Sequence, residues 1–324
     1  MAAASGVSRS TVSRVVNGST AVSPEALTAV QAAIARLNYV PNRAARSLAS
    51  RQTHAIALVV PEDTARFFGD PYFAAIVAGI NARMSESEYI LTLLIASDDP
   101  GDKVTRFVLN GGVDGALIIS HHTSDSFVER IAQAVPVVFG GRPIPARAAD
   151  YIVDIDNIAG ARAATAHLVS RGCRKIATIT GALTMPAGSD RLSGFRAALT
   201  DANQQSTGEY NADFSEQGGA DAARRMLASG KELPDGLFIA SDLMARGALG
   251  VLRAAGLRVP EDIAVVGFDD SPIAVAVDPA LTTVRQPTRE QGEAMVDVLL
   301  KVLAGGDATH LTTLPTELVV RASA

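Results

Sequence analysis

The chain has 324 residues, of which 48% are apolar and 19% charged, so it is expected to form two or three globular units and lies well outside the disordered range. Its single cysteine, Cys173, excludes an intrachain disulfide and a multi-cysteine zinc site, which fits a reducing cytoplasm. No apolar run approaches the roughly 18 residues that span a bilayer, and the first residues lack the pattern of an export signal. Composition therefore predicts a cytoplasmic protein without a membrane partner.

Charge is distributed unevenly along the chain. Residues 1–52 contain six arginines and one acidic residue, Glu25, although the whole chain has a formal net charge of -5. The remainder of the chain is therefore acidic. A basic segment joined to an acidic body is typical of a phosphate-binding module attached to a domain that does not touch nucleic acid.

Three short helices are expected at the start of the chain, over residues 1–5, 8–17 and 23–37. Ser8 can cap the second helix, and Ser23-Pro24-Glu25 supplies an N-cap, an N1 proline and an early acid for the third. Apolar residues recur at helical spacing and are expected to close a small core. They are Val12, Val15, Val16, Leu27, Val30, Ile34 and Leu37.

Residues 42–52 form an arginine-rich segment with helical propensity and little apolar surface. Alone it should be a marginal helix, one that forms when a partner helix or DNA supplies contacts. Leu48 has no core of its own to enter, and apolar wedges of this kind kink duplexes when they are inserted between base pairs. Packing of Leu48 against the body is the alternative.

From residue 53 onward, short apolar runs alternate with longer helical stretches. Near-continuous β-branched runs are what a buried parallel sheet requires, and the intervening stretches are long enough for crossover helices. Two similar halves predict two doubly wound α/β lobes within residues 53–324, with a boundary near residue 150 and recrossings near residues 281–286 and 310. The runs are AIALVV, ILTLLIA, GALIIS, PVVF, YIVDI, KIATIT, GLFIA and IAVVGF.

Residues just after the predicted strands are candidates for a ligand site, because open α/β sheets bind ligands beyond the carboxyl ends of their strands. Carboxylates and an arginine can hydrogen-bond to pairs of hydroxyl groups, and aromatic rings can cover an apolar face, so this set suits a polyhydroxylated ring. The aromatic residues placed near the mouth are Phe67, Phe68, Tyr72 and Phe73, and the charged residues are Arg191, Asp242, Asp269 and Asp270.

The segment SGVSRSTVSRVVNGSTAVSPEALTAVQAAIARLNYVPNRAARSLA resembles the DNA-binding head of the LacI/GalR family of repressors. The likeness continues through VDIDNIAGARAATAHLVSRG, SDLMARGALGVLRAAGLRVPEDIAVVGFDD and PALTTVRQP, so it covers almost the whole chain. It implies a helix-turn-helix head over residues 1–41 with a truncated first helix, and a hinge helix over residues 42–52. Residues 53–324 would form a body like the periplasmic binding proteins, which binds an effector and dimerises.

The second helix carries the residues expected to contact DNA. Its exposed side presents Arg9, Ser10 and Arg14, which can enter the major groove, where one bidentate arginine–guanine pair discriminates by about 1–3 kcal/mol. The resemblance implies that these three residues read bases. Contacts to the phosphate backbone would come from Ser8, Thr11, Ser13 and Asn17. The alternative is that the small polar residues merely solvate a helix.

The resemblance further implies that the hinge helix, with Asn42 near its start, pairs with its twin in a homodimer and pushes Leu48 into the minor groove. A symmetric dimer implies a pseudopalindromic double-stranded DNA operator. The last residues show no leucine heptad, which favours a dimer over a tetramer.

Six residues match positions that line the effector cleft in relatives, namely Tyr72, Phe73, Asp156, Arg191, Asp242 and Asp269. Sugars are the commonest effectors in the family, and purines and nucleosides also occur; the sequence leaves this choice open. The function implied is a transcriptional regulator, expected to be a repressor, whose operator affinity follows a small molecule bound between two lobes. No cofactor is expected.

Relatives carry about eight residues ahead of this point, which complete the first helix of the head. Met1 stands where relatives commonly have valine, and a GTG codon is read as methionine at a start and as valine internally. We therefore expect the natural protein to begin further upstream.

The same sequence bears on other classes of function. Adjacent His121 and His122 point in different directions and have no acid or third histidine at helical spacing, so no metal site is expected. No GxSxG elbow, P-loop or GxGxxG fingerprint is present, which argues against an enzyme. A sugar-binding protein without a DNA function would share the body but would have no use for the basic head.

Overall fold

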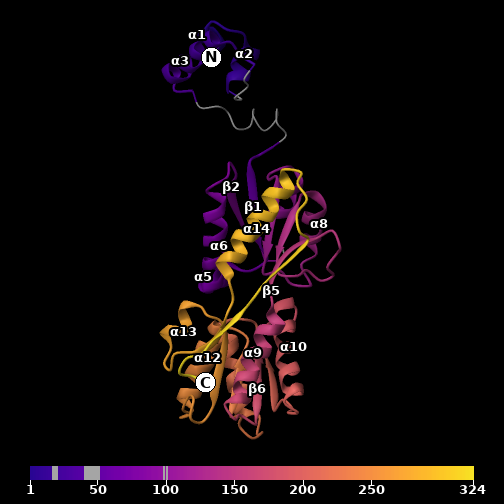
Figure 1. The fold of residues 1–324 in the computed structure, drawn as a ribbon, viewed down its shortest axis with the longest axis vertical. Helices are drawn as coiled ribbons and strands as arrows, with labels where there is room; N and C mark the ends of the chain where they lie inside the picture. Colours follow the sequence, from indigo (N-terminus) through magenta and orange to yellow (C-terminus); the bar gives the residue numbers. More distant parts are fainter. Residues whose placement is uncertain (17–20, 40–51, 98, 100) are drawn as a thin grey trace. The chain divides into compact units, whose positions relative to one another are not determined.

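The computed structural model describes residues 1–16, 21–39, 52–97, 99 and 101–324. The chain separates into two compact units, Met1–His54 and Ala55–Ala324, which we call the head and the body (Figure 1). Three residues with predicted DNA contacts, Asn17, Asn42 and Leu48, lie outside the described residues.

The head contains the three expected helices, α1 (Ala2–Ser5), α2 (Arg9–Val16) and α3 (Pro24–Leu37). The capping predictions are confirmed. Ser8 Oγ accepts a hydrogen bond from the Thr11 backbone N–H (3.1 Å), and Ser23 Oγ accepts one from that of Ala26 (3.3 Å). Pro24 occupies the first position of α3, where a missing N–H costs nothing.

The core of the head is smaller than the sequence predicts. Val12, Val30 and Ala33 are buried, whereas Leu27 and Leu37 are 40% and 50% exposed. Helices α1 and α2 are short, and the first and last turns of α3 are largely exposed. The expectation that Leu27 and Leu37 help to close this core is therefore wrong.

The first lobe of the body, the N-lobe, is built on a six-stranded sheet in the order β11-β5-β4-β3-β1-β2, in which every neighbouring pair is parallel. Its strands are β1 (Ala55–Val60), β2 (Ile90–Ile95), β3 (Gly115–Ile119), β4 (Val137–Gly140), β5 (Tyr151–Ile155) and β11 (Leu311–Leu314). Its helices are α5 (Thr64–Gly69), α6 (Pro71–Met84), α7 (Lys103–Leu109), α8 (Ser126–Ala134) and α14 (Thr288–Leu303).

The second lobe, the C-lobe, repeats this plan in the order β12-β10-β9-β8-β6-β7, with only the β10–β12 pair antiparallel. Its strands are β6 (Ile176–Thr180), β7 (Gly208–Asn211), β8 (Gly236–Ile239), β9 (Ala264–Asp269), β10 (Thr282–Arg285) and β12 (Glu317–Val319). Its helices are α9 (Asn157–Ser170), α10 (Pro186–Asp201), α11 (Glu216–Ala228), α12 (Asp242–Ala254) and α13 (Pro272–Ala276).

Each sheet is covered on both faces, as the continuous apolar runs predict. All six residues of β1 are buried, and separate apolar clusters pack on the two sides of each sheet. Helices α6 and α14 approach closely at Gly79, where an added Cβ would lie 2.0 Å from the Arg289 carbonyl oxygen. The predicted fold, two doubly wound α/β lobes, is confirmed, and all eight apolar runs form strands.

The chain passes between the lobes at three places in the described body, as the yellow strands in Figure 1 show for the last of them. The first passage follows Ile155, because β5 still belongs to the N-lobe sheet and carries the chain beyond the expected boundary near residue 150. The second follows Arg285 and the third lies between Leu314 and Glu317. No helix of the described chain is long and apolar enough to cross a membrane.

Candidate functional site

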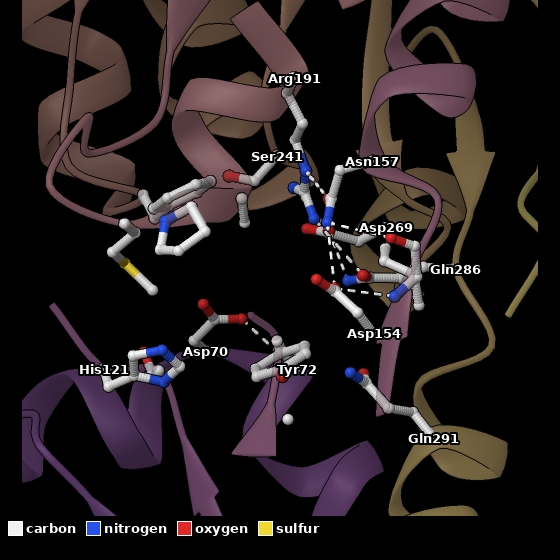
Figure 2. A pocket seen from close by; sticks show the side chains of 18 of the residues that line it. Asp70, Tyr72, His121, Asp154, Asn157, Arg191, Ser241, Asp269, Gln286 and Gln291 are labelled. Atoms are coloured by element: carbon white, nitrogen blue, oxygen red, sulfur yellow. Dashed lines mark hydrogen bonds and ion pairs between the residues drawn. The ribbon is translucent and has the colours of Figure 1, made fainter. Parts of the chain in front are cut away.

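A cleft lies between the two lobes, at the carboxyl ends of strands from both sheets (Figure 2). Its empty volume, which includes open solvent at the mouth, is about 720 Å³. Residues after β1, β3, β4, β8 and β10 contribute to its lining, which is the position that open α/β sheets use for ligands.

Arg191 is the central cation of the C-lobe wall. It lies in α10 and is 5% exposed, and its guanidinium stacks over the Phe268 ring, 3.7 Å from the centroid. Its Nε donates to Asn157 Oδ1 (2.9 Å) and its Nη1 to the Ala240 carbonyl oxygen (2.6 Å). Burial lowers the pKa of Arg191, and these acceptors, together with Asp269, hold the charged side chain in one place.

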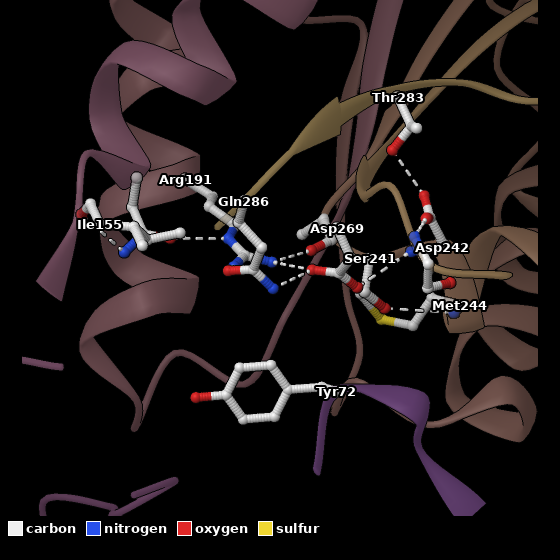
Figure 3. Close-up of polar contacts among 12 residues, drawn as sticks. Tyr72, Ile155, Arg191, Ser241, Asp242, Met244, Asp269, Thr283 and Gln286 are labelled. Carbon is white, nitrogen blue, oxygen red and sulfur yellow. Dashed lines mark hydrogen bonds and ion pairs between the residues drawn. The ribbon is translucent and has the colours of Figure 1, made fainter. Parts of the chain in front are cut away.

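Asp269 is the anionic partner of Arg191 (Figure 3). Its Oδ1 lies 3.4 Å from Arg191 Nη1 and accepts a hydrogen bond of 2.8 Å from Gln286 Nε2. Burial raises the pKa of Asp269 well above its ordinary value, and the Arg191 charge opposes that shift. The residue ends β9 with φ 119°, a strained conformation for a non-glycine residue of the kind that clusters at ligand sites.

The structure places Asp242 behind the cleft wall and not among the lining residues. Asp242 is 0% exposed; its Oδ1 accepts from the Thr283 hydroxyl (2.6 Å) and its Oδ2 from the Ser271 N–H (2.8 Å). Its own N–H donates to Asp269 Oδ2 (3.4 Å). Both oxygens are thus engaged inside the C-lobe, so Asp242 supports Asp269 and does not face the cleft as expected.

Asp156 also lies outside the lining, because its side chain caps α9 by accepting from the Ala159 N–H (2.8 Å). The flanking residues Asp154 and Asn157 line the cleft in its place. Strand β5 ends at Ile155 and α9 begins at Asn157, so Asp156 is the N-cap residue of the helix, a role that the strand pattern does not reveal.

The N-lobe wall begins at α6, where Asp70, Tyr72 and Phe73 line the cleft. Asp70 Oδ1 accepts from the Tyr72 N–H (3.0 Å), which caps the helix. Figure 2 shows Asp70, Tyr72 and His121 on one side of the cleft and Arg191, Asn157, Asp269 and Gln286 on the other.

Two other aromatic residues expected near the mouth are not part of the lining. Phe67 is packed into the N-lobe core, and Phe68 is 77% exposed. The aromatic face on the C-lobe side is instead Phe214, whose ring lies 5.7 Å from the Arg191 guanidinium. Phe214 follows the polar strand β7, which the sequence pattern does not predict, so the residue had no signal of its own.

Polar contacts connect the lobes across the cleft. Arg142, after β4, donates from Nη2 to both carboxylate oxygens of Asp190 on α10 (2.7 and 2.8 Å). The Thr123 N–H donates to the Thr184 carbonyl oxygen (3.0 Å), and the His122 Nδ1 lies 2.9 Å from Thr184 Oγ1. These contacts hold the two walls together in the arrangement described.

The two adjacent histidines have different environments. His121 Nε2 donates to the Arg142 carbonyl oxygen (3.2 Å), and burial lowers the pKa of His121 to about 4. His122 Nε2 instead lies 3.2 Å from Glu62 Oε1. In the part of the chain that the structure describes, no three His, Cys, Asp or Glu side chains gather as a metal site requires.

The head presents a second candidate site on α2. Arg9, Ser10, Ser13 and Arg14 are exposed, and Thr11 is half-buried, while Val12 faces the small core. The exposed Ser8 hydroxyl contacts those of Ser10 (2.7 Å) and Thr11 (2.8 Å). The geometry leaves both arginines of this helix available to an anionic partner.

The fold and the cleft define the class of the protein: a two-lobed body like the periplasmic binding proteins, joined to a small helical head. Residues 165–324 match the family model described as periplasmic binding protein-like domain, and residues 1–42 match that described as bacterial regulatory proteins, lacI family.

The chain is 43% identical over 330 residues to the HTH-type transcriptional regulator CelR of Thermobifida fusca, an alignment that covers 100% of this chain and 96% of CelR. The match to the solved structure of a CelR–cellobiose complex covers 100% of this chain and 98% of the CelR chain, with a TM-score of 0.81 and 40% identity. The match to the lac repressor dimer bound to operator and the anti-inducer ONPF covers 99% of this chain and 97% of the repressor chain, with a TM-score of 0.86 and 31% identity. The chain belongs to the LacI family of bacterial regulatory proteins, and is a transcriptional regulator, not an enzyme.

Proposed function

We propose that this regulator is a cytoplasmic, homodimeric repressor whose operator affinity changes when a sugar binds between its lobes. The observation that carries the proposal is the buried Arg191–Asp269 pair, which lines a cleft that both lobes enclose. The similarity to the CelR–cellobiose complex supports a sugar, and cellobiose is the first candidate.

The chemistry of the cleft suits hydroxyl groups. Asp269 offers acceptor capacity on a fixed carboxylate, and Asn157 and Gln286 have amides that can donate and accept. Tyr72 and Phe214, from opposite lobes, offer aromatic surfaces for the apolar faces of a sugar ring. A sugar held by these groups would satisfy donors and acceptors on both walls.

Binding on both walls gives the sugar a means to act at a distance. Tyr72 and Asp154 belong to the N-lobe wall, and Arg191 and Asp269 to the C-lobe wall. A sugar that contacts both groups favours one arrangement of the lobes over another. A preference of a few kcal/mol is enough to shift the population and, through the dimer, the spacing of the heads.

The proposed DNA contacts are on the exposed side of α2 and in the segment after it. Arg9, Ser10 and Arg14 read base edges in the major groove. The proposed phosphate and hinge contacts are Ser8, Thr11, Ser13, Asn17, Asn42 and the wedge residue Leu48. The lac repressor dimer seen on its operator supports a homodimer on a pseudopalindromic site.

The experiment that tests this function has two arms. Calorimetry with cellobiose, ribose and a nucleoside panel should give saturable binding of a sugar and none of a nucleoside. A duplex selected by the protein from a random pool should then bind with a different Kd in the presence of that sugar. Binding of nucleosides alone would replace the sugar with a purine-type effector, and absence of any preferred duplex would refute the regulator.

A further inference from the structure

Every arginine that lines the cleft already has a carboxylate partner. Arg66 lies 3.2 Å from Glu62, Arg142 is paired with Asp190 at 2.7 Å, and Arg191 is paired with Asp269 at 3.4 Å. The lining imidazole adds no positive charge, because burial lowers the pKa of His121 to about 4. Each cationic side chain of the described lining therefore has an acidic side chain within ion-pair distance.

Two lining carboxylates, Asp70 and Asp154, have no cation in direct contact, although the Arg66 and Arg191 charges act on Asp70 and the Arg142 charge acts on Asp154 from a greater distance. Neither forms an ion pair of 4.0 Å or less within the described chain. Asp154 accepts from the N–H groups of Ile155 (2.8 Å) and Arg142 (3.1 Å), so its contacts are to neutral donors. Asp70 receives the Tyr72 N–H on Oδ1. Figure 2 shows the Asp70 carboxylate directed toward the open centre of the cleft.

We infer that the cleft selects an uncharged, unphosphorylated sugar and that Asp70 is a specificity-determining residue for this selection. The inference rests on the proposed function and deepens it by naming the charge of the ligand. A phosphate ester or sugar acid would bring negative charge beside Asp70 and Asp154, and every arginine among the described lining residues already has an acidic partner. Like charges brought together in a partly desolvated site are strongly disfavoured.

The burial of these two carboxylates also supports the selection of an uncharged sugar. It raises the pKa of both Asp70 and Asp154, which means that the cleft already disfavours the negative charges it has. Asp70 is the better position for selection, because its second oxygen, Oδ2, has no hydrogen bond from any residue of the described chain and faces incoming ligand.

The test compares three ligands by calorimetry: cellobiose, a cellobiose monophosphate, and the monoacetate at the same hydroxyl. The acetate adds bulk without charge, so it separates size from charge. We expect the acetate to bind within about tenfold of cellobiose and the phosphate about 100-fold more weakly or worse.

Asp70→Asn keeps an oxygen that can cap α6 and removes the charge, so it should fold. We expect it to strengthen binding of the phosphate about tenfold in absolute terms. The matched control is Asp63→Asn, which changes the exposed N-cap of α5 outside the cleft and should alter neither ligand.

The inference is overturned if the phosphate binds as well as cellobiose, if the acetate is rejected equally, or if Asp70→Asn leaves phosphate binding unchanged. Those results would leave the sugar-responsive repressor intact. If no sugar binds to the folded protein, the proposed function fails and this inference fails with it.

Discussion

The head and the body expose their functional residues in opposite ways. In the head, Arg9 and Arg14 project from a short helix whose core is little more than Val12, Val30 and Ala33. In the body, by contrast, functional side chains are buried and bonded to one another before any ligand arrives. The exposed arginines of the head must therefore be ordered when a partner binds, whereas the side chains of the cleft are already held in place within the fold.

The largest effect is expected on sugar affinity, from a substitution in the buried cleft of the body. Asp269→Asn keeps the contact with Gln286 and is tolerated at positive φ, but it removes the charge opposite Arg191 and an acceptor for sugar hydroxyls. We expect sugar affinity to fall about 100-fold or more, measured by calorimetry, because hydrogen bonds to charged groups are the strong ones. Operator affinity without sugar should stay within a few fold; equal loss of both would point to a folding defect and contradict the division of labour.

The corresponding test in the head is Arg14→Ala. We expect the preference for a selected operator over random duplex to fall about 10- to 100-fold, because a bidentate arginine–guanine contact discriminates by about 1–3 kcal/mol. Fluorescence anisotropy measures both affinities, and Arg130→Ala, an exposed arginine of the body, is the control. Retained sequence discrimination would remove Arg14 from the readers, and altered sugar binding would break the proposed independence of the two regions.

A smaller effect, on the pH dependence of stability, is expected from substitution of Asp242, whose carboxyl is buried behind the cleft. Burial raises its pKa to about 7 from an ordinary 3.8, so between these values the folded state binds more protons than the unfolded state. The stability that Asp242 contributes is fully present below about pH 4 and is lost as pH rises through about 7. Asp242→Asn can keep both contacts, since the Thr283 hydroxyl can accept as well as donate.

We therefore expect Asp242→Asn to raise the free energy of unfolding relative to the native protein by about 1–3 kcal/mol more at pH 8 than at pH 4. Urea unfolding at several pH values measures this. If the free energies of unfolding of the wild type and the variant change with pH in parallel across that range, the buried environment assigned to the Asp242 carboxyl is contradicted.

The smallest effect is expected at the contact between the lobes. Asp190→Asn weakens the pair with Arg142, which is 42% exposed, so sugar affinity should fall only about two- to fivefold. Asp221→Asn removes an exposed carboxylate that pairs within the C-lobe and should have no effect on affinity. An effect of Asp190→Asn as large as that of Asp269→Asn would mean that lobe closure, more than the buried pair, dominates affinity.

The sequence predicts most of the fold because the information is local. Eight β-branched apolar runs predict buried parallel strands, and N-cap residues such as Ser23 predict where helices begin. Strands β7, β10, β11 and β12 escape prediction, since GEYN, TTVR, LTTL and ELV lack a continuous apolar run and are strands only because a neighbouring strand pairs with them. Pairing of that kind is tertiary information.

The site is predicted less completely, for the same physical reason. Sequence identifies the ends of strands as the ligand edge, which brings Tyr72, Arg191 and Asp269 together in one cleft. Sequence alone does not show whether a carboxylate at such a strand end faces the ligand, caps a helix as Asp156 does, or lies behind another site residue as Asp242 does. Those outcomes depend on which backbone N–H groups lie nearby in space.

The most direct test of the account is operator binding by the wild-type protein and Asp269→Asn, each with and without saturating cellobiose. We expect the sugar to change the wild-type Kd for the selected duplex at least about tenfold and to leave that of the variant unchanged. An equal shift in both proteins would contradict the claim that the buried Arg191–Asp269 pair senses the metabolite that controls the head.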